Sequence, residues 1–112
     1  MAKDWYGVRS VFHMFMKESG VNVFEERVVC FEAASYEELF EKSAREAERY
    51  ARGDGSMGAS AHPDQISYQI DAESGAKLVD GLELWSQLFE FRGTLEEFYS
   101  KRYDVYEFDL ET

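Results

Sequence analysis

The sequence predicts an α+β fold, in which an antiparallel sheet of four strands, or five, carries two helices in the order β-β-α-β-β-α. Two kinds of periodicity support this class. Apolar residues alternate with period two in several stretches, and elsewhere they recur at the three- and four-residue spacing of a helix. The chain has 112 residues, of which 45% are hydrophobic. We therefore expect one domain over residues 1–112 with a core of its own.

The first two strands are expected over residues 5–16 and 22–33. The first alternates between two faces, and the second is rich in β-branched and aromatic side chains. The polar link Lys17-Glu18-Ser19-Gly20 is short, which predicts an antiparallel hairpin. If Ser19-Gly20 forms the turn, residues whose numbers add up to 39 face each other.

The clearest element is a helix over residues 36–52. Ser35 is a good N-cap, and Glu38 completes a Ser-x-x-Glu capping box. Apolar and small residues recur along this segment at the i, i+3, i+4 spacing of one buried stripe. Gly53 follows as a natural stop.

Two further strands are expected over residues 65–71 and 82–91, after a glycine-rich loop over residues 53–62. The last of these strands carries apolar groups on both faces. That pattern indicates either a strand covered on both sides or a strand with a bulge. Thr94 and Glu97 then form a second capping box at the start of the last helix.

The end of the chain is open to two interpretations. In residues 104–112 aromatic and aliphatic side chains alternate with acidic ones, as in a short edge strand or an acidic aromatic arm. The order of the elements predicts that both helices pack on one face of the sheet. The other face would then be open, and we expect a functional site there.

The charge of the chain narrows the classes of partner. Asp and Glu number 23 against 12 Lys and Arg, which gives a formal net charge of -11. That field repels phosphate, so binding to nucleic acid or to an anionic membrane surface is disfavoured. A basic protein partner would be attracted. The alternative is that the acidity serves only solubility.

Cysteine and histidine usage predicts no metal or cofactor. Cys30 is the only cysteine, which excludes an intrachain disulfide and a multi-cysteine zinc site. Neither His13 nor His62 shows the spacing of a helical metal motif, and His62, next to Pro63, is expected to be solvated. The chain starts without the apolar core of a signal peptide, and no stretch is long enough to span a membrane. We therefore expect a cytoplasmic protein.

Several motifs, in order along the chain, resemble those of a known family. They are Trp5-Tyr6-x-Val8-Arg9, Phe24-Glu25-Glu26-Arg27-Val28, a helix of the Ala/Glu/Arg type from Ser35, Gly81-x-Glu83-Leu84-Trp85-Ser86, and Thr94-Leu95-Glu96-Glu97-Phe98-x-x-x-Arg102-Tyr103. The ordered set runs from Trp5 to Tyr106 and resembles the bacterial domain of unknown function family 4288. This resemblance implies a small bacterial protein, and it supplies no catalytic residue.

The candidate binding residues are charged and aromatic side chains of the sheet. In the expected register His13 faces Glu26, and Arg9 faces Cys30. The complete candidate site consists of Trp5, Arg9, His13, Glu26, Glu32 and Trp85. Such a cluster either binds a small polar ligand or a partner's charged loop, or forms a structural network of cross-strand pairs.

The face assignment depends on the register of the hairpin. A slip of one residue would place Glu25 and Arg27 on that face instead. Acid/base catalysis has little support. Carboxylates are plentiful in an acidic chain, so finding several of them on the strands does not indicate a catalytic pair. Cys30 with His13 is the one nucleophile–base pair worth naming, and a lone cysteine in a strand is more commonly a small buried hydrophobe. We therefore predict no catalytic residue.

Two functions follow from these observations. The first is a non-enzymatic interaction protein that uses its acidic surface and aromatic sheet face to bind a basic protein or its own copy. An immunity or inhibitor protein is one form of it. The second is a small-molecule-binding domain or weak enzyme on the open sheet face, with Arg9 holding an anion and Glu26 or Glu32 acting as base.

Overall fold

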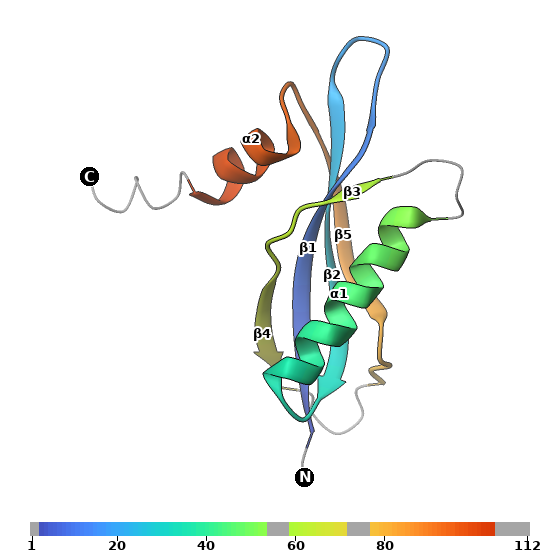
Figure 1. Ribbon diagram of the computed structural model, residues 1–112, viewed down its shortest axis with the longest axis vertical. Coiled ribbons are helices and arrows are strands. Elements are labelled where there is room, and N and C mark those ends of the chain that lie inside the picture. Colours follow the sequence, from blue (N-terminus) through green and yellow to red (C-terminus); the bar gives the residue numbers. More distant parts are fainter. Residues whose placement is uncertain (1–2, 54–58, 72–76, 105–112) are drawn as a thin grey trace, which may run out of the picture.

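The computed structural model describes residues 3–53, 59–71 and 77–104. In these ranges the chain forms an antiparallel sheet and two helices, as the sequence predicts (Figure 1). The elements are β1 (Asp4–Met16), β2 (Asn22–Ala33), α1 (Tyr36–Arg52), β3 (Ser60–Ala61), β4 (Ile66–Ile70), β5 (Leu82–Phe91), α2 (Leu95–Tyr99) and a π-helical turn (Ser100–Asp104). The expected edge strand or arm lies outside the described residues, apart from Asp104.

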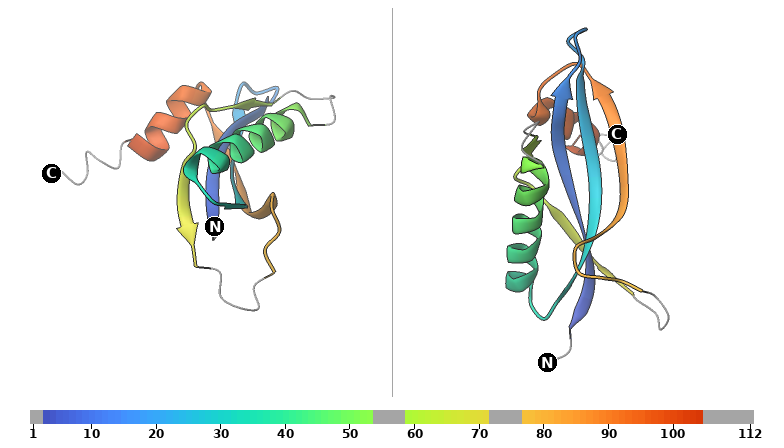
Figure 2. Two further views of the ribbon diagram at one scale, coloured as in Figure 1. Left: turned by 60° about the horizontal axis from the view of Figure 1, so that its bottom comes forward. Right: turned by 90° about the vertical axis from the view of Figure 1, so that its right-hand side faces the viewer.

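The sheet is built around the long hairpin of β1 and β2. β5 pairs with the outer side of β2. The outer side of β1 is shared, because β4 pairs with Trp5–Arg9 and β3 pairs with Phe12 and His13. The right-hand view of Figure 2 shows β1, β2 and β5 side by side, with β5 outermost. β5 and β4 are therefore the two long edges of this sheet.

The register of the hairpin differs from the expected one by two residues. Arg9 lies opposite Val28, and His13 lies opposite Phe24. Two local features cause the shift. The turn is centred on Ser19, since Met16 pairs with Asn22, and β1 carries an extra residue in a bulge between His13 and Phe15. A shift of two keeps every side chain on its expected face.

The helices lie on opposite faces of the sheet, so the prediction that they share a face is wrong. Ala47 and Ala51 of α1 pack on Phe12, whereas Phe98 and Tyr99 of the last helix pack against the neighbouring Val11. Successive residues of a strand point to opposite faces. We call these the α1 face and the α2 face. Both faces must be shielded from water, because the hairpin carries apolar side chains on each of them.

Both helices begin at the predicted N-caps, but at α1 the Glu38 carboxylate accepts from Ala34 and not from Ser35, so the predicted reciprocal capping box forms only at α2. The Ser35 hydroxyl accepts a hydrogen bond from the Glu38 backbone N–H at 3.1 Å, and the Glu38 carboxylate accepts one from the Ala34 N–H at 2.6 Å. Thr94 and Glu97 form the full reciprocal capping box. These caps fix where α1 leaves β2 and where α2 leaves β5.

β5 combines a bulge with an exposed surface. Trp85 lies opposite Val28 and Glu83 lies opposite Val29, so Leu84 is the extra residue. This confirms one of the two interpretations of its apolar pattern. Most of the strand is exposed, including large apolar side chains: Leu82, Leu84, Trp85 and Leu88.

Candidate functional site

The α2 face carries all six candidate residues. Trp5 pairs with Glu32, Val11 pairs with Glu26, and directly opposed residues of a strand pair share a face. Arg9 and His13 have the same parity as Val11, and Trp85 lies opposite Val28 on that face. The structure does not gather the six into one cluster, because they are spread along the length of β1, β2 and β5.

Glu26 is buried beneath the π-helical turn. The Arg102 Nε donates a hydrogen bond to Glu26 Oε2 at 3.1 Å, and the Tyr103 hydroxyl donates a second one to the same oxygen. Burial alone would raise the pKa of the Glu26 carboxyl, but these donors and the charges of Arg102 and Arg9 hold the pKa below its ordinary value. Glu26 is therefore a paired carboxylate.

Arg9 belongs to the same network. Its Nη2 donates a hydrogen bond to the Tyr99 hydroxyl at 3.0 Å, and its guanidinium carbon lies 3.8 Å from the centroid of the Tyr103 ring. The guanidinium carbon of Arg102 lies 5.6 Å from the centroid of the same ring and 4.2 Å from the centroid of the Phe89 ring. Tyr99 and Tyr103 hold the cluster together, although neither is among the six predicted site residues.

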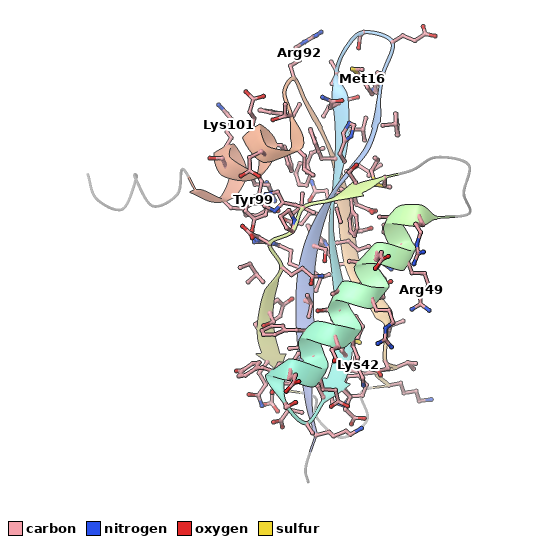
Figure 3. The ribbon with its side chains drawn as sticks, in the orientation of Figure 1. Met16, Lys42, Arg49, Arg92, Tyr99 and Lys101 are labelled. Carbon is pink, nitrogen blue, oxygen red and sulfur yellow. The ribbon has the colours of Figure 1, made fainter. Side chains whose placement is uncertain are left out.

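His62 extends the network, although it was expected to be solvated. The side chain is buried, with 4% of the residue exposed, and its ring stacks on that of Tyr99 at 3.8 Å between centroids. Its backbone N–H donates to the Val11 carbonyl at 2.8 Å, which draws this segment onto the edge of β1. Figure 3 shows Tyr99 below α2 and Lys101 on the other side of the helix.

The hydrogen bonds of His62 define its tautomer. Nδ1 accepts the backbone N–H of Asp64 at 3.1 Å, so in the neutral ring the proton resides on Nε2. Nε2 donates it to Glu96 Oε2 at 2.8 Å. We interpret this series of contacts, from Glu96 through to Arg102, as the network that holds α2 against the sheet.

The other four candidate residues take no part in that network. His13 Nε2 makes a hydrogen bond with Asn22 Oδ1 at 2.8 Å. The backbone N–H of Glu32 donates to Asp80. Trp5 lies in a shallow groove of ≈ 390 Å³ at the end of β4. Trp85 is 43% exposed on β5.

A second cluster of charges lies on the α1 face. Arg27 Nη1 and Nε lie 2.7 Å from the carboxylates of Glu46 and Glu83, and the Arg27 side chain is 8% exposed. Its guanidinium stacks on the Tyr50 ring at 3.7 Å. The Tyr50 hydroxyl donates to Glu25 at 2.5 Å. Burial raises the pKa of the Glu25 carboxyl.

The features that nucleophilic catalysis would need are kept apart. Cys30 lies opposite Gly7, not beside His13. Its thiol is buried, 3.4 Å from the Val79 carbonyl, and burial raises its pKa. A groove of ≈ 400 Å³ lies between α1 and the segment around His62, but its lining includes none of the candidate residues.

Metal-binding clusters and membrane-spanning helices are absent from the part of the chain that the structure describes. Residues 3–53, 59–71 and 77–104 contain no group of three or more His, Cys, Asp or Glu side chains close enough to hold a metal ion. None of the helices described is long and apolar enough to cross a membrane. Comparison with protein-family models, curated proteins and solved structures found no match.

The edge of β5 carries several exposed apolar side chains. Among the described residues β5 pairs only with β2, so its outer backbone groups face away from the sheet. Leu84, Trp85 and Leu88 are between 40% and 59% exposed along it. An edge strand of this kind is a template for pairing with another strand.

Proposed function

We propose that this chain is a protein-interaction module whose binding surface is the outer edge of β5. The observation that carries this proposal is a ten-residue edge strand with exposed Leu84, Trp85 and Leu88. A partner strand added there gains main-chain hydrogen bonds, and pockets for alternate side chains give it specificity.

The charges of β5 support the same interpretation. Natural edge strands are protected from pairing by charged side chains, especially lysine. β5 carries two charged residues, Glu83 and Glu90, and each is paired within the chain, with Arg27 and Lys17 respectively. Both carboxylates of the strand are therefore engaged in ion pairs, although Arg27 is shared with Glu46, and the strand carries no lysine.

The network around Glu26 favours interaction over catalysis. A general base needs a lone pair directed at the substrate, whereas the Glu26 carboxylate is occupied by Arg102 and Tyr103. Arg9, the residue expected to hold an anion, is stacked on Tyr103 and bonded to Tyr99. A small-molecule function on this face would require these contacts to break.

The proposal also includes the cellular location of the protein and the nature of its partner. We place the protein in the cytoplasm, where a lone buried thiol such as Cys30 stays reduced. A basic partner, the immunity-like role and the resemblance to family 4288 remain predictions, and none of them determines which surface binds.

Affinity capture with matched variants tests the proposal. The tagged chain is incubated with lysate of its host, and the retained proteins, its own untagged copy included, are compared with those of Leu88→Lys and Phe40→Lys. Leu88 on β5 and Phe40 on α1 are similarly exposed, at 59% and 56%. We expect the partner to be lost only with Leu88→Lys. A partner retained equally by both variants would refute the β5 surface.

A further inference from the structure

A groove between α1 and the residues just before β5 is lined by more cations than carboxylates. It has a volume of ≈ 300 Å³. Its charged lining residues are Lys42, Arg45 and Arg49 on the one hand, and Glu46 and Asp80 on the other. The chain as a whole has nearly twice as many carboxylates as cations, 23 against 12. The groove therefore reverses the charge balance of the chain.

Both carboxylates of the groove are already paired. Asp80 Oδ2 accepts a hydrogen bond from Lys42 Nζ at 2.8 Å. The Glu46 carboxylate accepts one from Nη1 of the buried Arg27 at 2.7 Å, and the Glu46 side chain is 13% exposed. These two ion pairs leave the charges of both arginines that line the groove uncompensated.

Arg45 and Arg49 have no ion-pair partner in the parts of the chain that the structure describes. Both are exposed on α1. They are four residues apart, which on a helix sets their Cβ atoms about 5–6 Å from each other and makes like charges repel. Arg52 of the same helix, by contrast, is paired with Glu48 at 3.5 Å. An anion between Arg45 and Arg49 would replace this repulsion by two attractive contacts.

A phosphate group matches this pair of arginines in geometry and in charge. A guanidinium presents a planar fork of N–H donors that fits two phosphate oxygens, and it stays protonated at any physiological pH. A phosphate monoester carries a charge of about -1.5 to -2 at pH 7. That charge compensates both arginines, whereas one carboxylate compensates only one. The other walls leave room for a small substituent, because Phe31 is apolar and Gly81 has no side chain.

The acidity of the chain is compatible with such a site if the ligand is small. At physiological ionic strength the interaction between exposed charges is largely screened beyond about 8 Å. A single phosphate group therefore responds mainly to the arginines that it touches, whereas a long polyanion also meets the acidic surface around them. The volume of ≈ 300 Å³ lies at the lower end of the range for small-molecule sites, about 300–1,000 Å³.

We infer that this groove binds a single phosphate group, of inorganic phosphate or of a small phosphate monoester, between Arg45 and Arg49. The inference goes beyond the proposed function and does not depend on it, because none of the groove residues belongs to β5.

Titration with inorganic phosphate tests the site. The backbone amide signals of the isotope-labelled chain are followed by NMR at constant ionic strength, with sodium chloride as the balancing salt. We expect the signals around Arg45, Arg49 and Gly81 to shift and to saturate. A parallel titration with phenyl phosphate distinguishes the two sources of the phosphate group. Tighter binding of phenyl phosphate assigns the groove to a phosphate monoester, and equal binding assigns it to inorganic phosphate.

Matched substitutions show whether the two arginines hold the ligand. Arg45→Gln and Arg49→Gln are each expected to weaken phosphate binding by about tenfold or more. Arg52→Gln is the control, because it removes an exposed arginine of the same helix that already has Glu48 as its partner. We expect it to leave the affinity for phosphate unchanged. Circular dichroism checks that all three variants fold.

The outcomes are independent of the test of β5. Signals that do not saturate in the wild type, an unchanged affinity in both Arg45→Gln and Arg49→Gln, or an equal loss in Arg52→Gln would each overturn the inference. Capture of a partner that depends on Leu88 is a separate measurement, so the proposed function can hold when the phosphate site fails, and the reverse.

Discussion

Tyr103 donates its hydroxyl hydrogen bond to the carboxylate of Glu26, a residue 77 positions earlier in the chain. The bond connects the π-helical turn after α2 to the centre of β2. Because Glu26 is buried, its charge is stable there only while Tyr103 and Arg102 face it. This contact is one of those that hold the π-helical turn over the α2 face of the sheet.

Tyr103→Phe is expected to destabilise the fold. It removes one donor from a buried carboxylate and leaves the ring in place, and a lost bond of this type costs about 1–3 kcal/mol. Urea unfolding followed by circular dichroism measures the change. Tyr36→Phe is the control, because Tyr36 is exposed on α1. Equal stability of the two variants would show that the Tyr103–Glu26 bond contributes nothing.

The lowered pKa of Glu26 predicts how stability depends on acid. A carboxyl whose folded pKa lies below its unfolded value stabilises the fold above the unfolded pKa, near 4.5, and this contribution is lost as pH falls through the folded pKa. Glu26→Gln is therefore less stable at neutral pH. Its unfolding free energy then falls less steeply than that of the wild type below pH 4.5. Chemical unfolding over an acid pH series measures both slopes, and parallel slopes would contradict the prediction.

The contribution of Glu25 to stability should depend on pH in the opposite sense. Burial raises the pKa of its carboxyl, so the wild type loses stability from this group as pH rises from about 4.5 through the raised folded pKa. Glu25→Gln removes that loss and retains an acceptor for the Tyr50 hydroxyl. The difference between variant and wild type should therefore shift in favour of the variant as pH rises. A constant difference across the same pH series would refute this.

Arg27→Met tests the buried charge cluster on the α1 face. The Arg27 side chain lies between Glu46 and Glu83, and removing it leaves both carboxylates without their cation. Breaking a buried pair in this way costs about 3–5 kcal/mol. The measurement is the midpoint and slope of urea unfolding.

A second variant distinguishes the contributions that the two ion pairs of Arg27 make to stability. Glu83→Gln removes the more exposed partner, at 41% exposure against 13% for Glu46, and it should cost far less than Arg27→Met. If both substitutions have the same effect, the buried pair with Glu46 is not what holds Arg27.

The helices and strands could be predicted because their signals are local. Ser35 with Glu38 and Thr94 with Glu97 lie within one helical turn of each other, so the spacing alone identifies the helix starts. The face of each strand residue also follows from alternation. For this reason the candidate residues share a face even though the expected hairpin register was wrong.

The contacts that shape the candidate surfaces depend on distant parts of the chain. The hairpin register followed from a bulge after His13 and a turn centred on Ser19, which residue types alone do not specify. His62 is buried because its segment joins the edge of β1 and Tyr99 stacks on it. Neither contact has a signal in the residues next to His62.

By itself, then, the sequence determined the fold class, the helix starts and the faces of the strands, because each depends on residues a few positions apart. It did not indicate the two-residue strand β3, which lies within the stretch expected to be a loop over residues 53–62. Only the tertiary structure decided that the helices take opposite faces, that Glu26 is occupied by Arg102 and Tyr103, and that β5 is an edge strand among the residues that the structure describes. These outcomes depend on which distant segments bury one another's apolar surface and satisfy one another's charges.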